Sequence, residues 1–384
     1  MKSVAVIPMD IHKKFSKAVV MDDEAGIIEE ERVGHKDHQE MQEFFGQFEA
    51  GTPVVMEATF NWPWISDLAE EMGLEPHLAH PMRAREMAKG MAKTDRRDAI
   101  FLGRLWLAGE IFPESYRAPR EVRRQRQLFR TRQMFVRMRT AIKNNIHGQL
   151  FRLGHVLDEE ASDLFSVKGR AVLKGLELAG DERQALERKL AALDDLARHI
   201  EVLEKVIRKE LRQDSRAEIL MSLPGVGEII AYGMLSEMGT MERFPDSRAL
   251  AAYAGLLPMA NESAEKDHGR HTGGACNHFL RWMMIEAVTG AVRGSGRMQS
   301  LYRRVKARNE HKVGKARVAV ARELIELSHL LLARGKTYQE TPPARPGSQK
   351  RLSVFKESKA GHSHPPRASQ TPLCARSERS QAEV

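Results

Sequence analysis

Residues 3–33 read SVAVIPMDIHKKFSKAVVMDDEAGIIEEERV and contain three runs of β-strand character. The runs cover residues 3–10, 17–21 and 27–33, and each is rich in β-branched or other apolar side chains. Aspartates and a glycine in residues 22–26 separate the last two runs and favour a turn. The stretch therefore predicts a three-stranded meander near the start of the chain.

Helix and strand signals alternate after the meander. The pattern predicts a helix over 35–48, a strand over 53–57, a helix over 62–72 and a strand over 76–79. A further helix is expected from Thr94. Three strands followed by helix, strand, helix, strand and helix is the order of an α/β ribonuclease-H-like domain.

Four acidic residues lie at strand ends and at a helix start in this predicted domain. Asp10 ends the first strand and Glu57 ends the fourth, while Asp95 and Asp98 fall in the first turn of a helix that Thr94 would cap. Carboxylates that converge in this way suit Mg²⁺ or Mn²⁺ beside a phosphate. The alternative is that each acid has an ordinary role, with the last two in a solvated salt-bridge cluster beside their basic neighbours Lys93, Arg96 and Arg97.

The composition favours a polyanionic partner. The 384 residues include 61 lysines and arginines against 52 acids, a net charge of +9. No apolar run approaches the ~20 residues of a spanning helix, and the amino terminus has no signal-peptide pattern, so we expect a cytoplasmic protein without membrane insertion. The two cysteines, Cys276 and Cys374, are too few and too distant for a disulfide framework.

A strongly basic helix is predicted over residues 117–152, where Glu121 is the one acid. Apolar residues give it a packing side and leave the basic residues to form a long cationic ridge. We expect this ridge to bind DNA or RNA phosphates, which arginine suits well; the alternative is an acidic helix of another subunit. The candidate binding residues are Arg117, Arg120, Arg123, Arg124, Arg126, Arg130, Arg132, Arg137, Arg139 and Lys143.

A second long helix is predicted over residues 182–213, which contain neither glycine nor proline. A heptad seam runs along it, broken once at Glu204, and indicates a coiled coil. The helix could be one arm of an intramolecular antiparallel hairpin with the basic helix, or it could associate subunits. The seam residues are Leu186, Leu190, Leu193, Ala197, Ile200, Ile207 and Leu211.

A tight turn between helices is predicted at LPGVG, residues 223–227. It matches the helix-hairpin-helix pattern of DNA-binding proteins, in which glycine lets backbone amides approach a phosphate. Gly225 and Gly227 are therefore candidate nucleic-acid contacts. The alternative is a hairpin whose glycines serve its geometry alone.

Ser263 lies in a polar loop between two apolar helical stretches, with Lys266, His268, Arg270 and His271 nearby. A serine beside such cations could attack a phosphate as a nucleophile, or it could be an ordinary turn residue. The loop and its flank also gather His268, His271, Cys276 and His278, which invites a zinc interpretation although their spacing matches no standard finger.

The motifs together resemble one known family. MDIHK (9–13), MEAT (56–59) and KTDRRDA (93–99) are followed by the basic and coiled-coil helices, LPGVG, YAGLLP (253–258) with a serine after it, and LRWMMIEA (280–287). In this order, over about residues 3–332, the chain resembles the DEDD transposases of the insertion-sequence 110 family.

The resemblance implies an enzyme of DNA recombination. It implies a RuvC-like domain whose acids Asp10, Glu57, Asp95 and Asp98 bind Mg²⁺, and a transposase domain in which Ser263 is the nucleophile. It further implies a homo-oligomer, dimer or tetramer, that acts on DNA in the bacterial nucleoid with a structured guide RNA.

The sequence departs from the family pattern beside the serine. Ser263-Ala264 replaces the usual Ser-Gly, and residues 269–276 differ from the usual Gly-x-Ile-Thr-Lys-x-Gly-Asn. Two other functions therefore stay open, a RuvC-like junction nuclease in which water attacks and a nucleic-acid-binding protein without catalysis.

Four segments follow from these patterns. We expect a RuvC-like catalytic domain over 1–112, a basic and coiled-coil linker over 113–215, and a mainly α transposase domain with the helix-hairpin-helix over 216–334. Residues 335–384 combine prolines with serine, lysine, arginine and histidine, which predicts a disordered basic tail.

Overall fold

The computed structural model describes residues 3–89, 94–109, 112–155, 163–257, 276–310 and 312–340. They belong to a compact unit spanning Met1–Glu340. The predicted tail falls almost wholly beyond residue 340, outside the described residues. None of the described helices is long and apolar enough to cross a membrane.

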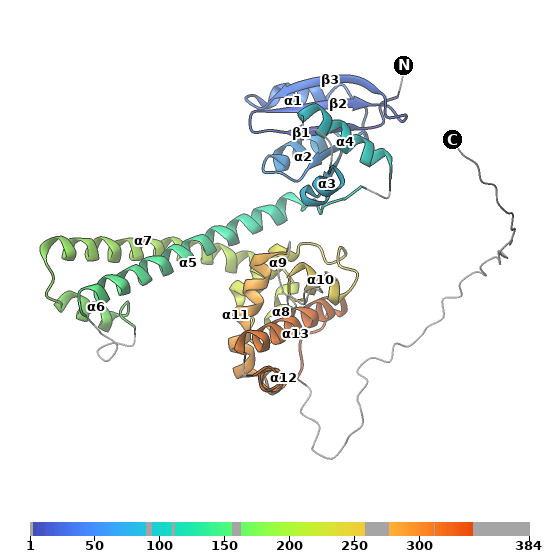
Figure 1. The fold of residues 1–384 in the computed structure, drawn as a ribbon. Coiled ribbons are helices and arrows are strands. Elements are labelled where there is room, and N and C mark those ends of the chain that lie inside the picture. Colours follow the sequence, from blue (N-terminus) through green and yellow to red (C-terminus); the bar gives the residue numbers. More distant parts are fainter. Residues whose placement is uncertain are drawn as a thin grey trace, which may run out of the picture. The chain divides into compact units, whose positions relative to one another are not determined.

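A mixed five-stranded sheet forms the amino-terminal part, as the strand pattern predicted (Figure 1). Its order is β3-β2-β1-β4-β5; β1–β2 and β2–β3 pair antiparallel, and β1–β4 and β4–β5 pair parallel. The first strand begins later than predicted, because Val6 makes only an isolated bridge with Met21 before the regular ladder starts. The strands are β1 (Ile7–Ile11), β2 (Phe15–Met21), β3 (Ile27–Gly34), β4 (Pro53–Glu57) and β5 (Glu75–Ala79).

Helices cover both faces of this sheet, which explains why the central strands β1 and β4 are mostly apolar and buried. Ile7 and Met9 face a core completed by α1 (His38–Phe45) and α2 (Trp62–Glu71). Val6 and Val55 face the opposite core, which α3 (Pro81–Met87) and α4 (Asp95–Leu107) complete.

Helix α4 approaches the sheet very closely at Gly103. A Cβ atom there would lie 2.5 Å from Met21 Sδ and 2.8 Å from Pro8 Cγ, so a larger residue would force the helix outward. The close packing fixes the start of α4 relative to β1 and β2.

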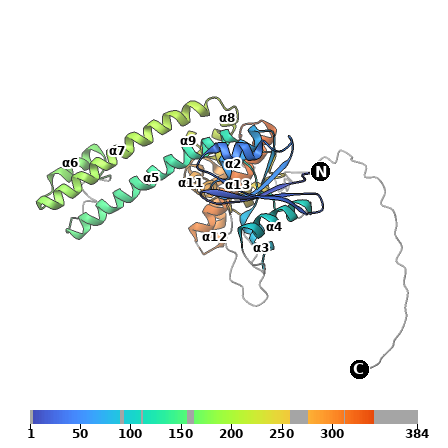
Figure 2. The ribbon, with the colours of Figure 1, turned by 90° about the horizontal axis from the view of Figure 1, so that it is seen from above.

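Two long helices, α5 (Arg120–Arg152) and α7 (Gly180–Leu211), pack side by side (Figures 1 and 2). Contacts join Gln149 to Lys189, Arg132 to Glu204 and Arg124 to Glu210, so the two helices run antiparallel. A short helix, α6 (Val167–Gly175), lies between them in sequence. The intramolecular hairpin, one of the two alternatives left by the sequence, is present.

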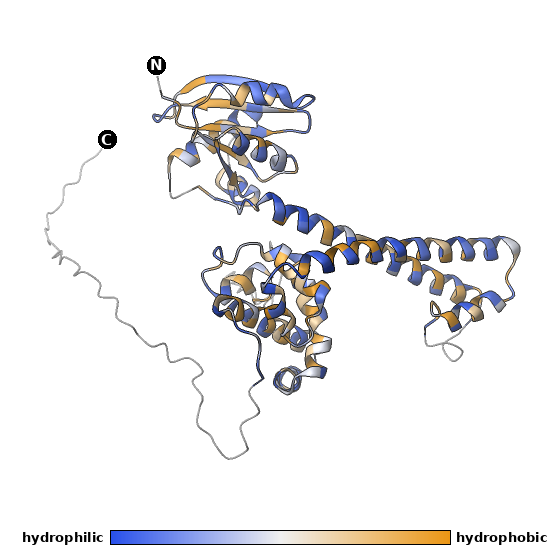
Figure 3. Cartoon of the chain, turned by 180° about the vertical axis from the view of Figure 1, so that it is seen from behind, coloured by the Kyte–Doolittle hydropathy of each residue, from blue (hydrophilic) through white to orange (hydrophobic). Residues whose placement is uncertain are grey.

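The packing seam of α7 differs from the predicted heptad at one step. Leu196 is buried and Ala197 is exposed, so the assignment of Ala197 to the seam is wrong. Glu204 breaks the seam because it pairs with Arg132 of α5, and both side chains are largely buried. Figure 3 accordingly shows hydrophobic and hydrophilic stretches mixed along both helices.

The regular elements of the carboxyl-terminal part are all helices among its described residues, in agreement with the predicted mainly α domain, and they share one apolar core. Helix α13 contacts α8, α10, α11 and α12, and α5 contributes Phe129 to the same core. The helices are α8 (Arg216–Met221), α9 (Glu228–Met238), α10 (Ser247–Tyr253), α11 (His278–Gly294), α12 (Gly296–Arg308) and α13 (Val313–Arg334).

Candidate metal centre and nucleic-acid contacts

The predicted acids of the sheet lie at one edge. Asp10 is the fourth residue of β1, and Glu57 is the last residue of β4. Because β1 and β4 are parallel neighbours, their carboxyl ends meet at the same edge of the sheet.

The start of α4 supplies the other two acids. Thr94 caps the helix, with its hydroxyl accepting a hydrogen bond from the Arg97 amide at 3.3 Å, as predicted. Asp95 and Asp98 then occupy the first turn, where the helix dipole favours negative charge.

All four acids line one cavity of about 540 Å³. Its lining also includes Arg85 and Lys89, which belong to α3 and the residues just after it. An acidic floor with basic side chains beside it suits a phosphate that approaches a bound cation.

His12 also lines the cavity, and the sequence analysis did not single it out. Its Nε2 lies 3.1 Å from Asp10 Oδ2 and 3.1 Å from Asp95 Oδ2. The ligand atoms of Asp10, His12 and Asp95 all fall within 4.8 Å of one another. The available signal was the two-residue spacing from Asp10, which places alternate residues of a strand on one side.

The electrostatics of the cavity favour a cation. Burial raises the pKa of Asp10, the nearby His12 opposes that rise, and the negative charges of Asp95 and Asp98 add to it. His12 Nε2 is buried between the carboxylates of Asp10 and Asp95. Clustered carboxylates with a ring nitrogen among them fit a divalent metal, which would offset the repulsion among the acids.

Ser263 lies outside the described residues, as do His268 and His271 of the possible zinc set. The two ends of that segment are described and lie together. The Asn277 amide donates to the Tyr253 carbonyl at 2.8 Å, and Gly255 lies close to Cys276. Cys276 Sγ is 3.6 Å from His278 Nδ1.

Ion pairs largely neutralise the predicted cationic ridge over residues 117–132, so this part of the helix does not present a free cationic surface. Apart from Glu121 of α5 itself, the acids come from α2, α7 and α9, which the local sequence of α5 cannot reveal. The ion pairs are Arg117–Glu70, Arg120–Glu71, Arg123–Asp67, Arg124–Glu121, Arg124–Glu210, Arg126–Glu237, Arg130–Glu237 and Arg132–Glu204.

Because of these pairs, the binding of nucleic acid by this helix stays a prediction. Arg120 is 78% exposed in its pair, and such surface pairs exchange readily for phosphate. Further along the helix, Arg137 lies over the Phe279 ring and Lys143 over the Phe165 ring, while Arg139 is partly exposed.

The two glycines of the LPGVG turn differ in their surroundings. Gly225 has a φ of +81°, and a Cβ there would lie 2.1 Å from the Ala287 carbonyl oxygen of α11. Close packing and backbone conformation therefore account for Gly225, which supports the geometric alternative at this position. A Cβ at Gly227 would meet nothing within 4 Å, so its contact with nucleic acid stays a prediction.

Two protein-family models match the chain. The transposase model of the DEDD type from the IS110 group covers residues 7–154, and the model described as "Transposase IS116/IS110/IS902 family" covers residues 217–303. The first match contains the cavity lined by the four acids, and the second contains the segment of Ser263.

Individual relatives agree with these models. The chain is 28% identical over 159 residues to the "Insertion element IS116 uncharacterized 44.8 kDa protein" of Streptomyces clavuligerus, covering 41% of this chain and 39% of the relative. It is 30% identical over 142 residues to an IS110 protein of Streptomyces coelicolor, covering 37% of this chain and 35% of the relative.

A longer match is to the "Transposase for insertion sequence element IS1111A" of Coxiella burnetii, 25% identical over 209 residues, with 53% of this chain and 57% of the relative covered. The chain thus spans less than two thirds of the length of these relatives. The resemblance seen in the sequence motifs is confirmed, and the chain belongs to the IS116/IS110/IS902 family of transposases.

Proposed function

We propose that the protein is a DNA recombinase of an insertion element, and that it cuts and rejoins DNA with a divalent metal. The observation that carries this proposal is the convergence of Asp10, Glu57, Asp95 and Asp98 on one cavity, joined by His12. The mixed sheet with helices on both faces supports a ribonuclease-H-like, RuvC-like domain around that cavity.

Asp10 and Asp95, with His12 between them, would hold the metal, and Glu57 and Asp98 would complete its surroundings. The bound Mg²⁺ or Mn²⁺ supplies charge stabilisation to a phosphate undergoing substitution. Arg85 and Lys89 would attract and orient the approaching DNA strand.

Ser263 is proposed as the nucleophile. Its Oγ would form a bond to a DNA phosphorus while the bond from that phosphorus to one strand oxygen breaks. The serine loses its proton to solvent or to a base, and the departing oxygen gains one. The reverse step, by the end of another strand, would restore the serine and join the DNA.

Other parts of the proposal rest on family membership. We infer that the protein binds DNA, uses a structured guide RNA, and works as a dimer or tetramer on the bacterial nucleoid in the cytoplasm. The predicted domains, 1–112, 113–215, 216–334 and 335–384, would supply the metal site, the linker, the serine and a basic tail.

A denaturing gel on the element's own end-junction DNA tests the proposal. Wild-type protein with Mg²⁺ or Mn²⁺ should form a covalent protein–DNA product, and EDTA should abolish it. Asp10→Asn and Ser263→Ala should each abolish strand transfer, and omission of the RNA should remove site choice.

The same gel distinguishes the two other functions. Metal-dependent cutting that persists in Ser263→Ala would identify a junction nuclease that uses water. Tight binding without any cutting by the wild type would identify a nucleic-acid-binding protein. Either outcome would reject the serine recombinase.

A further inference from the structure

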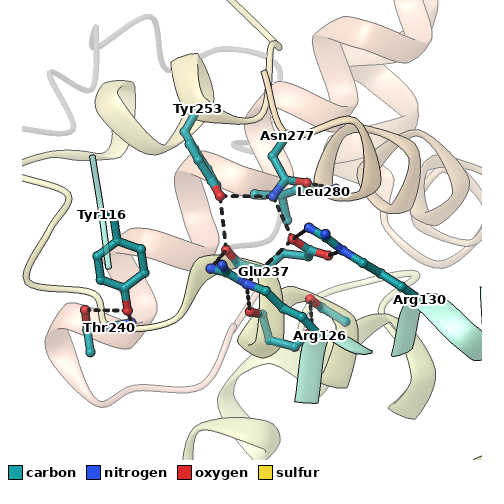
Figure 4. Close-up of polar contacts among 10 residues, drawn as sticks. Tyr116, Arg126, Arg130, Glu237, Thr240, Tyr253, Asn277 and Leu280 are labelled. Atoms are coloured by element: carbon teal, nitrogen blue, oxygen red, sulfur yellow. Dashed lines mark hydrogen bonds and ion pairs between the residues drawn. The ribbon is translucent and has the colours of Figure 1, made fainter. Parts of the chain in front are cut away.

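A guanidinium group is enclosed by three aromatic rings in the carboxyl-terminal part. The Cζ of Arg243 lies 4.2 Å from the ring centre of Tyr116, 4.3 Å from that of Phe244 and 4.3 Å from that of Tyr253. The Tyr116 hydroxyl accepts from the Thr240 hydroxyl at 3.3 Å (Figure 4). The rings hold Arg243 in one place through cation–π contact.

Two donor nitrogens of the Arg243 guanidinium have no hydrogen-bond acceptor in the described part of the chain. Nε and Nη2 of Arg243 are buried and have no hydrogen-bond partner among the described residues. Aromatic faces attract a cation but cannot accept directed hydrogen bonds as an oxygen anion does. Buried donors without an acceptor are costly. Arg243 as a residue is only partly buried and lines an adjoining pocket, where it is suited to an incoming anion.

The space beside Arg243 is basic. It is a pocket of about 900 Å³ whose lining includes Arg83, Arg126, Arg130 and Arg243 against one carboxylate, Glu114. Arg126 and Arg130 share the adjoining Glu237, so the surplus positive charge comes mainly from Arg83 and Arg243. Glu114 already pairs with His77 at 2.9 Å. The balance of charge in the lining favours an anionic ligand over a cationic or neutral one.

A second acid beside the pocket, Glu237, is already fully engaged. Its side chain is completely buried, and its two oxygens accept from Arg130 Nε and Nη2, both at 2.8 Å. One of them also accepts from the Asn277 side-chain amide at 2.8 Å (Figure 4). Glu237 therefore positions Arg130 and Asn277 and is not free to neutralise Arg243.

The pocket lies at the base of the segment that carries Ser263. Tyr253 and Asn277 both line it, and the Asn277 side-chain amide donates to the Tyr253 hydroxyl at 3.0 Å. These residues belong to the described stretches that precede and follow residues 258–275, and the two stretches meet here. A ligand in the pocket would thus touch both stretches.

We propose that this pocket, with Arg243 at its centre, binds a phosphodiester of the nucleic-acid backbone and so positions the strand beside the Ser263 segment. The proposal rests on the proposed function for the identity of its ligand as nucleic acid. A phosphate oxygen would accept from the Arg243 guanidinium when the side chain turns these donors toward the pocket that it lines.

Binding of the full-length chain to fluorescent oligonucleotides tests the proposal. Duplex DNA of the element end and RNA of the same sequence are titrated in EDTA at several salt concentrations, so that cutting plays no part. Arg243→Gln should weaken binding about tenfold near physiological salt. The slope of log affinity against log salt should shrink by about 0.7–0.9, the value of one lost phosphate contact.

Two variants serve as controls. Arg248→Gln removes an exposed arginine of α10 outside the pocket and should bind as the wild type does. Arg243→Lys keeps the charge but loses the guanidinium fork, so it should keep the slope and bind more weakly. If Arg243→Gln fails to fold, judged by its melting temperature, Arg243→Lys with wild-type affinity overturns the proposal.

A scan with neutral methylphosphonates locates the contact. One substituted phosphate should weaken wild-type binding and have no added effect in Arg243→Gln. If the substitution that loses its effect in Arg243→Gln lies in the DNA, the pocket binds the DNA strand. If it lies in the RNA, the pocket binds the RNA.

Unchanged affinity and slope in a folded Arg243→Gln protein would overturn the inference even if the wild type cuts DNA. If the binding changes occur as predicted but the wild type does not cut DNA, the proposed function is rejected and the inference about the pocket stands.

Discussion

At Asp10 the fold keeps a carboxylate where its charge is disfavoured. Burial, together with Asp95 and Asp98, raises its pKa, so the folded chain holds this proton more tightly than the unfolded chain does. Ionised Asp10 therefore lowers the stability of the folded state increasingly as the pH rises above the ordinary value of 3.8, up to the raised pKa. A bound metal would remove this cost at neutral pH.

Asp10→Asn should consequently separate stability from function. We expect cleavage to fall at least ~100-fold, because a metal ligand is lost. In EDTA at neutral pH the variant should melt on the order of 2–4 °C above the wild type. Mg²⁺ should raise the melting temperature of the wild type only. Asp23→Asn, in an exposed turn, is the control and should change neither property.

His12 should influence which metal binds. Imidazole nitrogen is a softer ligand than carboxylate oxygen and suits Mn²⁺ better than Mg²⁺. We expect His12→Ala to weaken Mn²⁺ binding about tenfold and Mg²⁺ binding less, by calorimetric titration of the full chain. His38→Ala, an exposed histidine stacked on Trp64, should leave both affinities unchanged. Equal losses for the two ions would show that His12 only orients Asp10.

At the scale of the elements, the sequence predicted the sheet well because its signals are local. Strand 53–57 appears with the predicted bounds, and Thr94 caps α4 as its position indicated. Convergence of Asp10 and Glu57 followed from the strand order. His12 was missed because a histidine two residues past an acid is common and gains meaning only when Asp95 comes close.

The long hairpin shows what a local pattern cannot give. Residues 117–132 looked like an unpaired cationic surface because their acidic partners lie elsewhere, in Glu70, Glu204 and Glu237 among others. The α7 seam breaks at Glu204 for the same reason, because the partner of Glu204 is Arg132 of α5. The placement of Ser263 remains a prediction, since it lies outside the described residues.

The Arg132–Glu204 pair offers a prediction for the hairpin. Both side chains are at most 17% exposed, with Nη2 and Oε1 2.6 Å apart. Glu204→Ala should lower the unfolding free energy by about 2 kcal/mol, because it leaves the partly buried Arg132 without this partner. Replacing both residues, Arg132→Met with Glu204→Leu, should recover most of that loss in denaturant titrations.

The control for the hairpin is an exposed ion pair of the same helix. Glu201 pairs with Lys205 and is 62% exposed, so Glu201→Ala should leave the melting temperature unchanged. Full stability of Glu204→Ala would show that the pair contributes nothing. A double variant as unstable as Glu204→Ala would show that the seam requires the charge.

At the scale of the whole molecule, the proposed chemistry is divided between two parts of the chain. The acidic cavity lies between the sheet and helices α3 and α4, and Ser263 belongs to a segment whose described flanking residues meet at Tyr253 and Asn277. Neither part alone can perform the proposed strand transfer. Family membership adds the expectation of an oligomer, in which the two parts of one site could come from different subunits.

Mixing two inactive proteins tests that arrangement. Asp10→Asn chains keep the serine, and Ser263→Ala chains keep the metal site. If each site combines parts of two subunits, a mixed dimer contains one intact site and one doubly inactive site. Equal mixing then gives about a quarter of wild-type activity, since about half of the dimers are mixed.

The measurement is covalent product on the end-junction DNA after the two proteins have been denatured and refolded together. Each variant alone provides the baseline, and a mixture of Asp10→Asn with the double variant Asp10→Asn, Ser263→Ala serves as the control, because no intact site can form in it. Activity in the first mixture and none in the control would establish a shared site. Background activity in both, with mixed dimers present, would mean that each chain supplies its own metal and its own serine.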